Sequence, residues 1–76
     1  MKEILETIIM NLVADPKSVS INEIVGETAV IYEVKVAEND MGKIIGKQGK
    51  LARSIRSIMK AIAAKEKKRV TIEFIG

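Results

Sequence analysis

The sequence predicts an α+β domain in which a three-stranded sheet carries helices on one face. Some segments place apolar residues at helical spacing, and three others alternate apolar and polar residues as strands do. The order along the chain is helix, strand, strand, short helix, helix, strand (α-β-β-α-α-β). A two-layer arrangement would bury all the apolar stripes together. Because 76 residues leave little room for a second core, we expect one domain over residues 1–76.

The first half of the chain predicts a helix followed by a hairpin. The helix spans about 2–13, and its apolar stripe consists of Ile4, Leu5, Ile8, Ile9, Leu12 and Val13. Asp15-Pro16 ends it, because the residue before proline disfavours the helical region. Strands at 19–25 and 29–36 are joined by a short turn, which makes them antiparallel. In the second strand Val30, Tyr32, Val34 and Val36 are expected to face the core, with Glu33 and Lys35 in solvent.

The second half predicts two helices and a last strand. Asn39-Asp40 is typical of a helix N-cap, so a short helix is expected over 41–45. A longer helix follows from Lys50 to about Ala64, with an apolar face of Leu51, Ile55, Ile58, Met59 and Ile62. After a charged connection over 65–69, Val70, Ile72 and Phe74 alternate with polar residues as the final strand.

Composition argues against an enzyme. The chain has no histidine and no cysteine, and no carboxylates cluster near its glycines, so we predict no catalytic residue, no metal site and no cofactor. A P-loop would need G-x-x-x-x-G-K-[ST], but Gly42 and Gly46 are one residue too close. The dinucleotide-binding glycine pattern is also missing. No apolar run approaches the ~20 residues of a membrane span, so a cytoplasmic protein without a membrane partner is expected.

The charges are divided unevenly along the chain. Residues 1–40 carry a net charge of −5 and residues 41–76 a net charge of +8. A strongly basic half indicates a polyanionic partner.

Gly46 and Gly49 form a G-x-x-G turn within this basic half. Glycine permits positive φ and a close approach of the backbone to a ligand. The amide groups and dipole at the start of the following helix favour an anion. The spacing alone also fits a simple linker between helices. The surrounding cations Lys43, Lys47, Lys50, Arg53 and Arg56, with no acid over 41–65, favour a phosphate-binding turn instead.

The stretch Ile44–Ile55, IIGKQGKLARSI, resembles the signature of KH domains, whose G-x-x-G loop clamps about four nucleotides. The element order is that of the type II, bacterial form. The whole chain is similar in length and layout to the small bacterial KhpA (YlqC) family. Three further stretches resemble that family: Asp15-Pro16, Val25-Gly26-Glu27 and Lys68-Arg69-Val70. The resemblance implies a type II KH fold and cytoplasmic binding of single-stranded RNA with broad specificity. It also implies a homodimer and a heteromer with the larger KH-containing protein Jag (KhpB). In that family the pair is linked to post-transcriptional control, as a regulator or RNA chaperone, and to cell elongation and division.

The predicted RNA site centres on the turn. Its backbone amides and Lys47 would hold phosphates. Apolar residues near the turn would form the bottom of a groove for bases. Leu51 and Ile55 are candidates for this groove or for the core, and the core fits Ile55 better. The predicted RNA-binding residues are Lys43, Ile44, Ile45, Gly46, Lys47, Gln48, Gly49, Lys50 and Arg53. The two aromatic residues, Tyr32 and Phe74, are expected in the core, so binding should be weak and salt-sensitive.

A second hypothesis is a protein-interaction adaptor that works mainly by pairing with a larger KH-containing partner. The small size and the scarcity of aromatic residues leave room for it, whereas the basic half favours RNA. Candidates for a pairing surface are Met59, Phe74 and Ile75, because the core of so small a domain has limited room.

Overall fold

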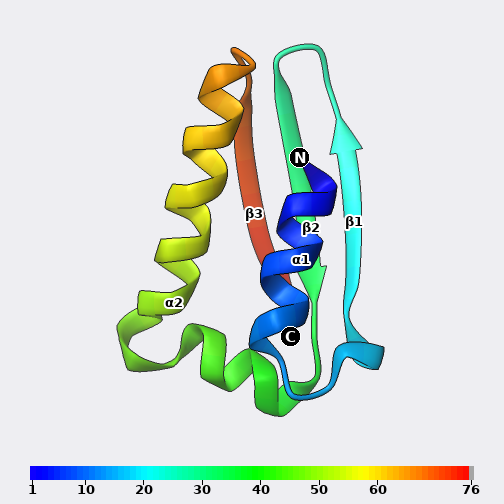
Figure 1. The fold of residues 1–76 in the computed structure, drawn as a ribbon, viewed down its shortest axis with the longest axis vertical. Coiled ribbons are helices and arrows are strands. Elements are labelled where there is room, and N and C mark those ends of the chain that lie inside the picture. Colours follow the sequence, from blue (N-terminus) through cyan, green and yellow to red (C-terminus); the bar gives the residue numbers. More distant parts are fainter. Residues whose placement is uncertain (76) are drawn as a thin grey trace.

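A computed structural model describes residues 1–75 and has the two-layer α+β architecture that the periodicities predict (Figure 1). Gly76, which the predicted domain includes, lies outside the described residues. The elements are α1 (Lys2–Leu12), the 3-10 turn η1 (Pro16–Ser18), β1 (Ser20–Val25), β2 (Ala29–Lys35), α2 (Glu38–Lys65) and β3 (Arg69–Ile75). The predicted strand and helix positions are therefore confirmed to within a few residues.

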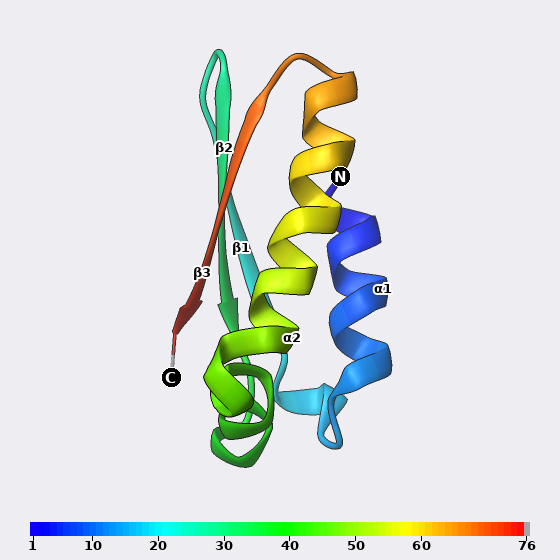
Figure 2. The ribbon, with the colours of Figure 1, turned by 90° about the vertical axis from the view of Figure 1, so that its left-hand side faces the viewer.

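The sheet has the order β1-β2-β3. β1 and β2 pair antiparallel as the predicted hairpin, with Val25 opposite Val30. β3 pairs parallel to β2, with Tyr32 opposite Ile72. A parallel pair needs a long crossover, and α2 supplies it. Figure 2 shows that both helices lie on one side of the sheet.

The core lies between the helices and the sheet. The alternation of β2 is confirmed, since Val30, Tyr32 and Val34 are fully buried while Lys35 is exposed. From the helices and β3 the fully or nearly fully buried side chains are Leu5, Ile9, Met41, Ile44, Ala52, Ile55, Met59, Ala63, Val70 and Ile72. Close packing of this set is the main source of stability.

Two residues of the predicted helical stripes do not reach the core. Ile4 of α1 is 43% exposed and Ile58 of α2 is 47% exposed. The buried face of α2 runs instead through Ala52, Ile55, Met59 and Ala63. Ile58 lies off this face, on the solvent side of the helix.

The predicted N-cap at Asn39-Asp40 is wrong. The helix begins at Glu38, and its N-cap residue, Ala37, makes no side-chain capping bond. Asp40 is instead only 3% exposed and accepts backbone N–H bonds from Ala14 at 2.8 Å and Asp15 at 3.0 Å. Its carboxylate therefore ties the segment after α1 to the first turn of α2.

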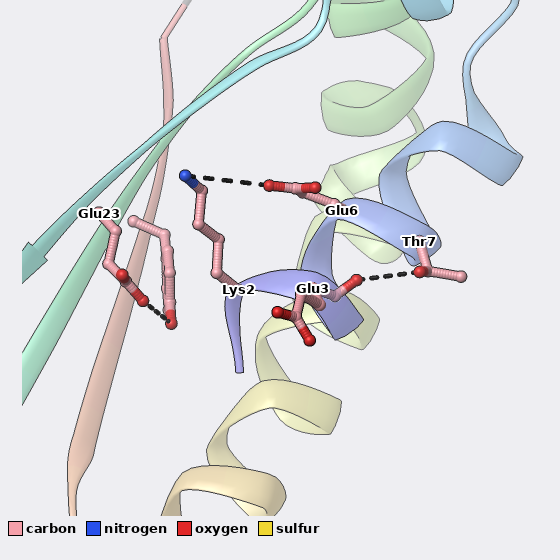
Figure 3. A network of polar contacts seen from close by, with 6 residues as sticks. Lys2, Glu3, Glu6, Thr7 and Glu23 are labelled. Carbon is pink, nitrogen blue, oxygen red and sulfur yellow. Dashed lines mark hydrogen bonds and ion pairs between the residues drawn. The ribbon is translucent and has the colours of Figure 1, made fainter.

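Tyr32, on the central strand β2, forms a side-chain hydrogen bond with the edge strand β1. Its hydroxyl donates to Glu23 of β1 at 2.6 Å (Figure 3). Burial, and then the bond to Glu23, raises the pKa of Tyr32 far above its ordinary value. Nearby on α1, Lys2 and Glu6 form an exposed ion pair at 3.9 Å, a contact that contributes little stability.

Candidate nucleic-acid interface

The G-x-x-G segment divides α2 into two helices. Gly46 has φ −60° and ψ 171°, and Lys47, Gln48 and Gly49 follow with φ of 54°, 63° and 69°. Helical residues therefore occupy 38–45 and 50–65, on either side of a left-handed turn (Figure 1). The predicted short helix, turn and long helix are confirmed, with the short helix beginning three residues earlier.

The turn holds two side-chain-bearing residues in an unfavourable conformation. Left-handed φ and ψ cost about 1–2 kcal/mol for a residue with a Cβ, and both Lys47 and Gln48 adopt them. Strain of this kind is concentrated at functional sites. Lys67, in the connection before β3, also has a positive φ of 57°, but only Lys47 and Gln48 are consecutive, and they lie between the two glycines of the turn.

Two glycines near the turn have no intramolecular reason to be glycine. Gly42 lies within the helical residues of α2, and Gly46 has a φ that any residue adopts. A Cβ added at either position would meet no atom within 4 Å. Gly49, by contrast, is needed for its positive φ. The missing side chains of Gly42 and Gly46 leave open surface that a ligand can approach.

A hollow of about 420 Å³ opens beside the turn, within the size range of ligand sites. It is lined by Gly42, Lys43, Gly46, Lys47, Lys50, Leu51 and Ser54. The half-buried Leu51 supplies an apolar wall, and the three exposed lysines surround it. An apolar wall surrounded by ammonium groups suits a ligand that combines a flat apolar ring with a phosphate.

The structure divides the predicted site residues into three groups. Lys43, Gly46, Lys47 and Lys50 line the hollow. Ile45, 49% exposed, lies with Gln48 and Arg53 on the surface near it, and Gly49 is half-buried. Ile44 is fully buried and belongs to the core, as does Ile55, for which the core was the favoured prediction.

Sequence reasoning missed Gly42 and Ser54 as lining residues. A glycine inside a helix, where it is unfavourable, was the signal that could have found Gly42. No comparable signal marks Ser54, because exposed serines are common on helices.

Further hollows lie between α2 and β3. One of about 150 Å³ is lined by Arg56, Lys60, Val70, Thr71 and Ile72. Another, of about 390 Å³, adds Lys68 and Arg69 to Lys60. The basic surface therefore continues from the turn along α2 to the start of β3.

Arg56 has a contact that the sequence did not predict. Its Nε donates to the backbone oxygen of Ile72 at 3.2 Å, and its guanidinium carbon lies 5.3 Å from the centre of the Phe74 ring. Arg56 therefore joins α2 to β3 and is not a free cation at the turn.

Residues 1–75 contain no cluster of histidine, cysteine, aspartate or glutamate suited to holding a metal ion. Over the same residues, no helix combines the length and the apolar character needed to cross a membrane.

Comparison with known proteins identifies the family. The model of the KhpA/KhpB KH domain matches residues 2–74. The chain belongs to the KhpA/KhpB family of KH domains. It is 53% identical over 75 residues to the RNA-binding protein KhpA of Clostridium acetobutylicum, covering 99% of this chain and 100% of that one. The RNA-binding protein KhpA of Chlamydia trachomatis is 40% identical, with 99% and 96% covered.

A solved structure with the same fold is that of Era in complex with MgGDPNP and nucleotides 1506–1542 of 16S ribosomal RNA. The TM-score is 0.61 and the identity 23%, over 95% of this chain. The chain spans only 28% of the Era chain, so this likeness concerns the fold of one part of that protein. The KhpA/KhpB KH fold predicted from the sequence is thus confirmed.

Proposed function

We propose that this protein binds single-stranded RNA, with the turn Gly46–Gly49 holding the sugar–phosphate backbone. The observation that carries the proposal is that the fold itself does not require glycine at Gly42 or Gly46, yet both line a hollow surrounded by lysines. The names of the KhpA relatives, which describe RNA-binding proteins, support it. The function is that of a binding module and not of an enzyme.

The mechanism follows from the backbone at the turn. The residues from Lys47 to Gly49 form a left-handed run, and such turns present successive N–H groups to an anion. Lys43, Lys47 and Lys50 add sequence-independent attraction. A base would lie on Leu51 and Ile45, since Ile44 is covered and takes part only by packing beneath the turn. Gln48 and Arg53 would contact the strand as it leaves the hollow.

The path of the RNA would continue from the turn along α2, where Lys60 and Lys68 line the smaller hollows. With no aromatic side chain at the turn, affinity would depend on phosphate contacts and fall steeply with salt.

The decisive experiment measures binding of a short labelled single-stranded RNA across a salt series. For the wild type we expect log K to fall with log salt at ~0.7 per phosphate contact. The variant Lys47→Asp with Gln48→Asp should lose binding and keep its fold, because aspartate tolerates positive φ better than most residues. Lys17→Asp, at an exposed position on η1, is the charge-reversal control away from the turn and should retain most of the affinity. Unchanged affinity in the double variant would exclude the turn as the clamp.

We further propose that residues 1–76 act as one KH domain in the cytoplasm, in post-transcriptional regulation or as an RNA chaperone. A role in cell elongation or division, and pairing with itself and with a Jag/KhpB-type KH protein, form part of this proposal. The ground for proposing the pairing is the family itself, whose model is named for KhpA and KhpB together. Deleting the gene and complementing it with the turn variant tests the cellular role: restored cell length without RNA binding would favour the adaptor function.

For self-association the structure changes the candidate surface. Met59 is fully buried and therefore cannot pair, and Phe74 is partly covered, whereas Ile75 is 40% exposed and remains a candidate. The exposed Ile4 and Ile58 of the helices favour a contact through the helical face. Sedimentation of wild type and Ile58→Asp tests this: a dimer that persists in the variant would exclude that face.

A further inference from the structure

The sheet leaves one of its faces open. Figure 2 shows α1 and α2 on the same side of the sheet, and the other side carries no element of residues 1–75. Parallel strands are usually covered on both faces, and β2 and β3 are a parallel pair. The strand register places on this open face Ser20, Asn22 and Ile24 of β1, Ala29, Ile31, Glu33 and Lys35 of β2, and Arg69, Thr71, Glu73 and Ile75 of β3.

Part of the open face is apolar. Ile24 is 48% exposed and is the direct cross-strand partner of Ile31. Ile75, at the other end of the face, is 40% exposed. Among residues 1–75, no helix or strand packs over these isoleucines. Folding of the domain alone therefore does not account for their position on the open face.

Two carboxylates lie between these apolar residues. Glu33 of β2 and Glu73 of β3 are direct partners in the parallel register. Like charges directly opposite each other destabilise a sheet. Asn22 donates an amide bond to Glu33 at 2.8 Å, but neither carboxylate has a cation within 4.0 Å among residues 1–75. Lys35 and Arg69 share the face without pairing with them.

We propose that this open face docks a segment of a partner protein in which an arginine or lysine lies between aliphatic residues. The cation would contact Glu33 and Glu73 together, a geometry for which the guanidinium fork is well suited. The aliphatic neighbours would cover Ile24 and Ile31 on one side and Ile75 on the other. A nucleic acid does not fit this face, because phosphates would meet the two carboxylates.

The docking face and the proposed RNA clamp lie on opposite sides of the domain. The clamp residues belong to α2, on the helical layer, whereas Glu33 and Glu73 point away from it. One molecule can therefore hold an RNA and a protein segment at the same time. The proposal does not rest on the RNA-binding function, and the two can fail independently.

The experiment places the photo-cross-linker p-benzoylphenylalanine at Ala29, an exposed position on the same face of β2 as Ile31, in the full chain in cells. The control places it at Ser57, an exposed position on α2. Sequencing the cross-linked peptide by mass spectrometry identifies the captured segment. A synthetic peptide of that segment, and the same peptide with its basic residue changed to alanine, are then titrated against the purified protein.

We expect an adduct at position 29, absent at 57, whose segment holds arginine or lysine between aliphatic residues. Glu33→Gln with Glu73→Gln should weaken peptide binding about tenfold, as should loss of the basic residue. Glu27→Gln in the hairpin turn should not. The glutamine pair should leave RNA affinity and the melting temperature unreduced, since it removes the repulsion while the glutamine oxygen at position 33 can still accept the bond from Asn22. No adduct, an adduct with a second copy of this chain, a captured segment without a basic residue, or insensitivity to the glutamine pair would each overturn the proposal.

Discussion

The carboxylate of Asp40 accepts the backbone N–H of Ala14 at 2.8 Å, across 26 residues of sequence. A second bond, from the N–H of Asp15 at 3.0 Å, makes the contact two-pronged. This contact joins the end of α1 to the first turn of α2, six residues before the glycine turn begins. The position of the candidate RNA site thus depends on a carboxylate that takes no part in binding.

Asp40→Ala should lower the melting temperature markedly, because the backbone N–H groups of Ala14 and Asp15 would lose the buried carboxylate that accepts both of them. We expect a fall on the order of 5 °C or more, and a smaller one for Asp40→Asn, which keeps one oxygen. Calorimetry measures both. The neighbouring exposed Asn39→Ala is the control, and an equal effect there would contradict the role assigned to Asp40.

The same contact predicts an acid dependence of stability. The bond from Ala14 is the main cause that holds the pKa of Asp40 below its usual value, although burial acts in the opposite direction. The bond from Asp15 and the charge of Lys43 lower this pKa further. A group whose pKa is lowered by folding stabilises fully above its unfolded pKa, about 3.9, and loses that effect as the pH falls through the folded value. Urea unfolding of wild type and Asp40→Asn from pH 7 to pH 3 should show a stability difference that shrinks below about pH 4. A difference that is constant with pH would contradict this.

Gly42→Ala should separate stability from binding. Alanine is favoured over glycine inside a helix by about 1 kcal/mol, and its Cβ would meet no atom of the chain, so stability should rise. The same methyl group would enter the hollow beside the turn, so RNA affinity should fall. Thermal unfolding and RNA titration measure the two effects. Ser57→Ala, also on the exposed surface of α2, should raise stability without changing affinity; unchanged RNA binding in Gly42→Ala would mean that the hollow receives no part of the RNA.

Tyr32 is the one tyrosine of the chain, so phenolate absorbance reports on it alone. Burial and the bond to Glu23 raise its pKa, so the absorbance should appear well above pH 10, together with unfolding. Glu23→Gln should move the transition to lower pH, because it removes the negative charge beside the hydroxyl. A transition near pH 10 in the wild type would mean that the hydroxyl is accessible to water. Tyr32→Phe should cost about 1.5–3 kcal/mol of stability, as loss of a bond to a charged group does.

The turn was predictable because its chemistry is local. G-x-x-G, the lysines around it and the absence of acids over 41–65 are read directly from the chain. The left-handed conformation of Lys47 and Gln48 is not, because side-chain-bearing residues avoid it and only the flanking helices impose it. Arg56 likewise counted as one cation among several until its bond to Ile72 was seen.

By itself, the sequence determined the kind and order of the elements, the hairpin and the location of the basic turn. Those properties follow from periodicity, turn residues and charge, each of which acts over a few neighbouring residues. Only the tertiary structure decided that Asp40 anchors Ala14 instead of capping a helix, that Ile44 is covered while Ile45 is open, and that Ile58 faces solvent. It also set Glu33 opposite Glu73, on strands 40 residues apart in the chain. These outcomes depend on the rotation of α2 on the sheet and on the register of β3, which distant contacts fix together.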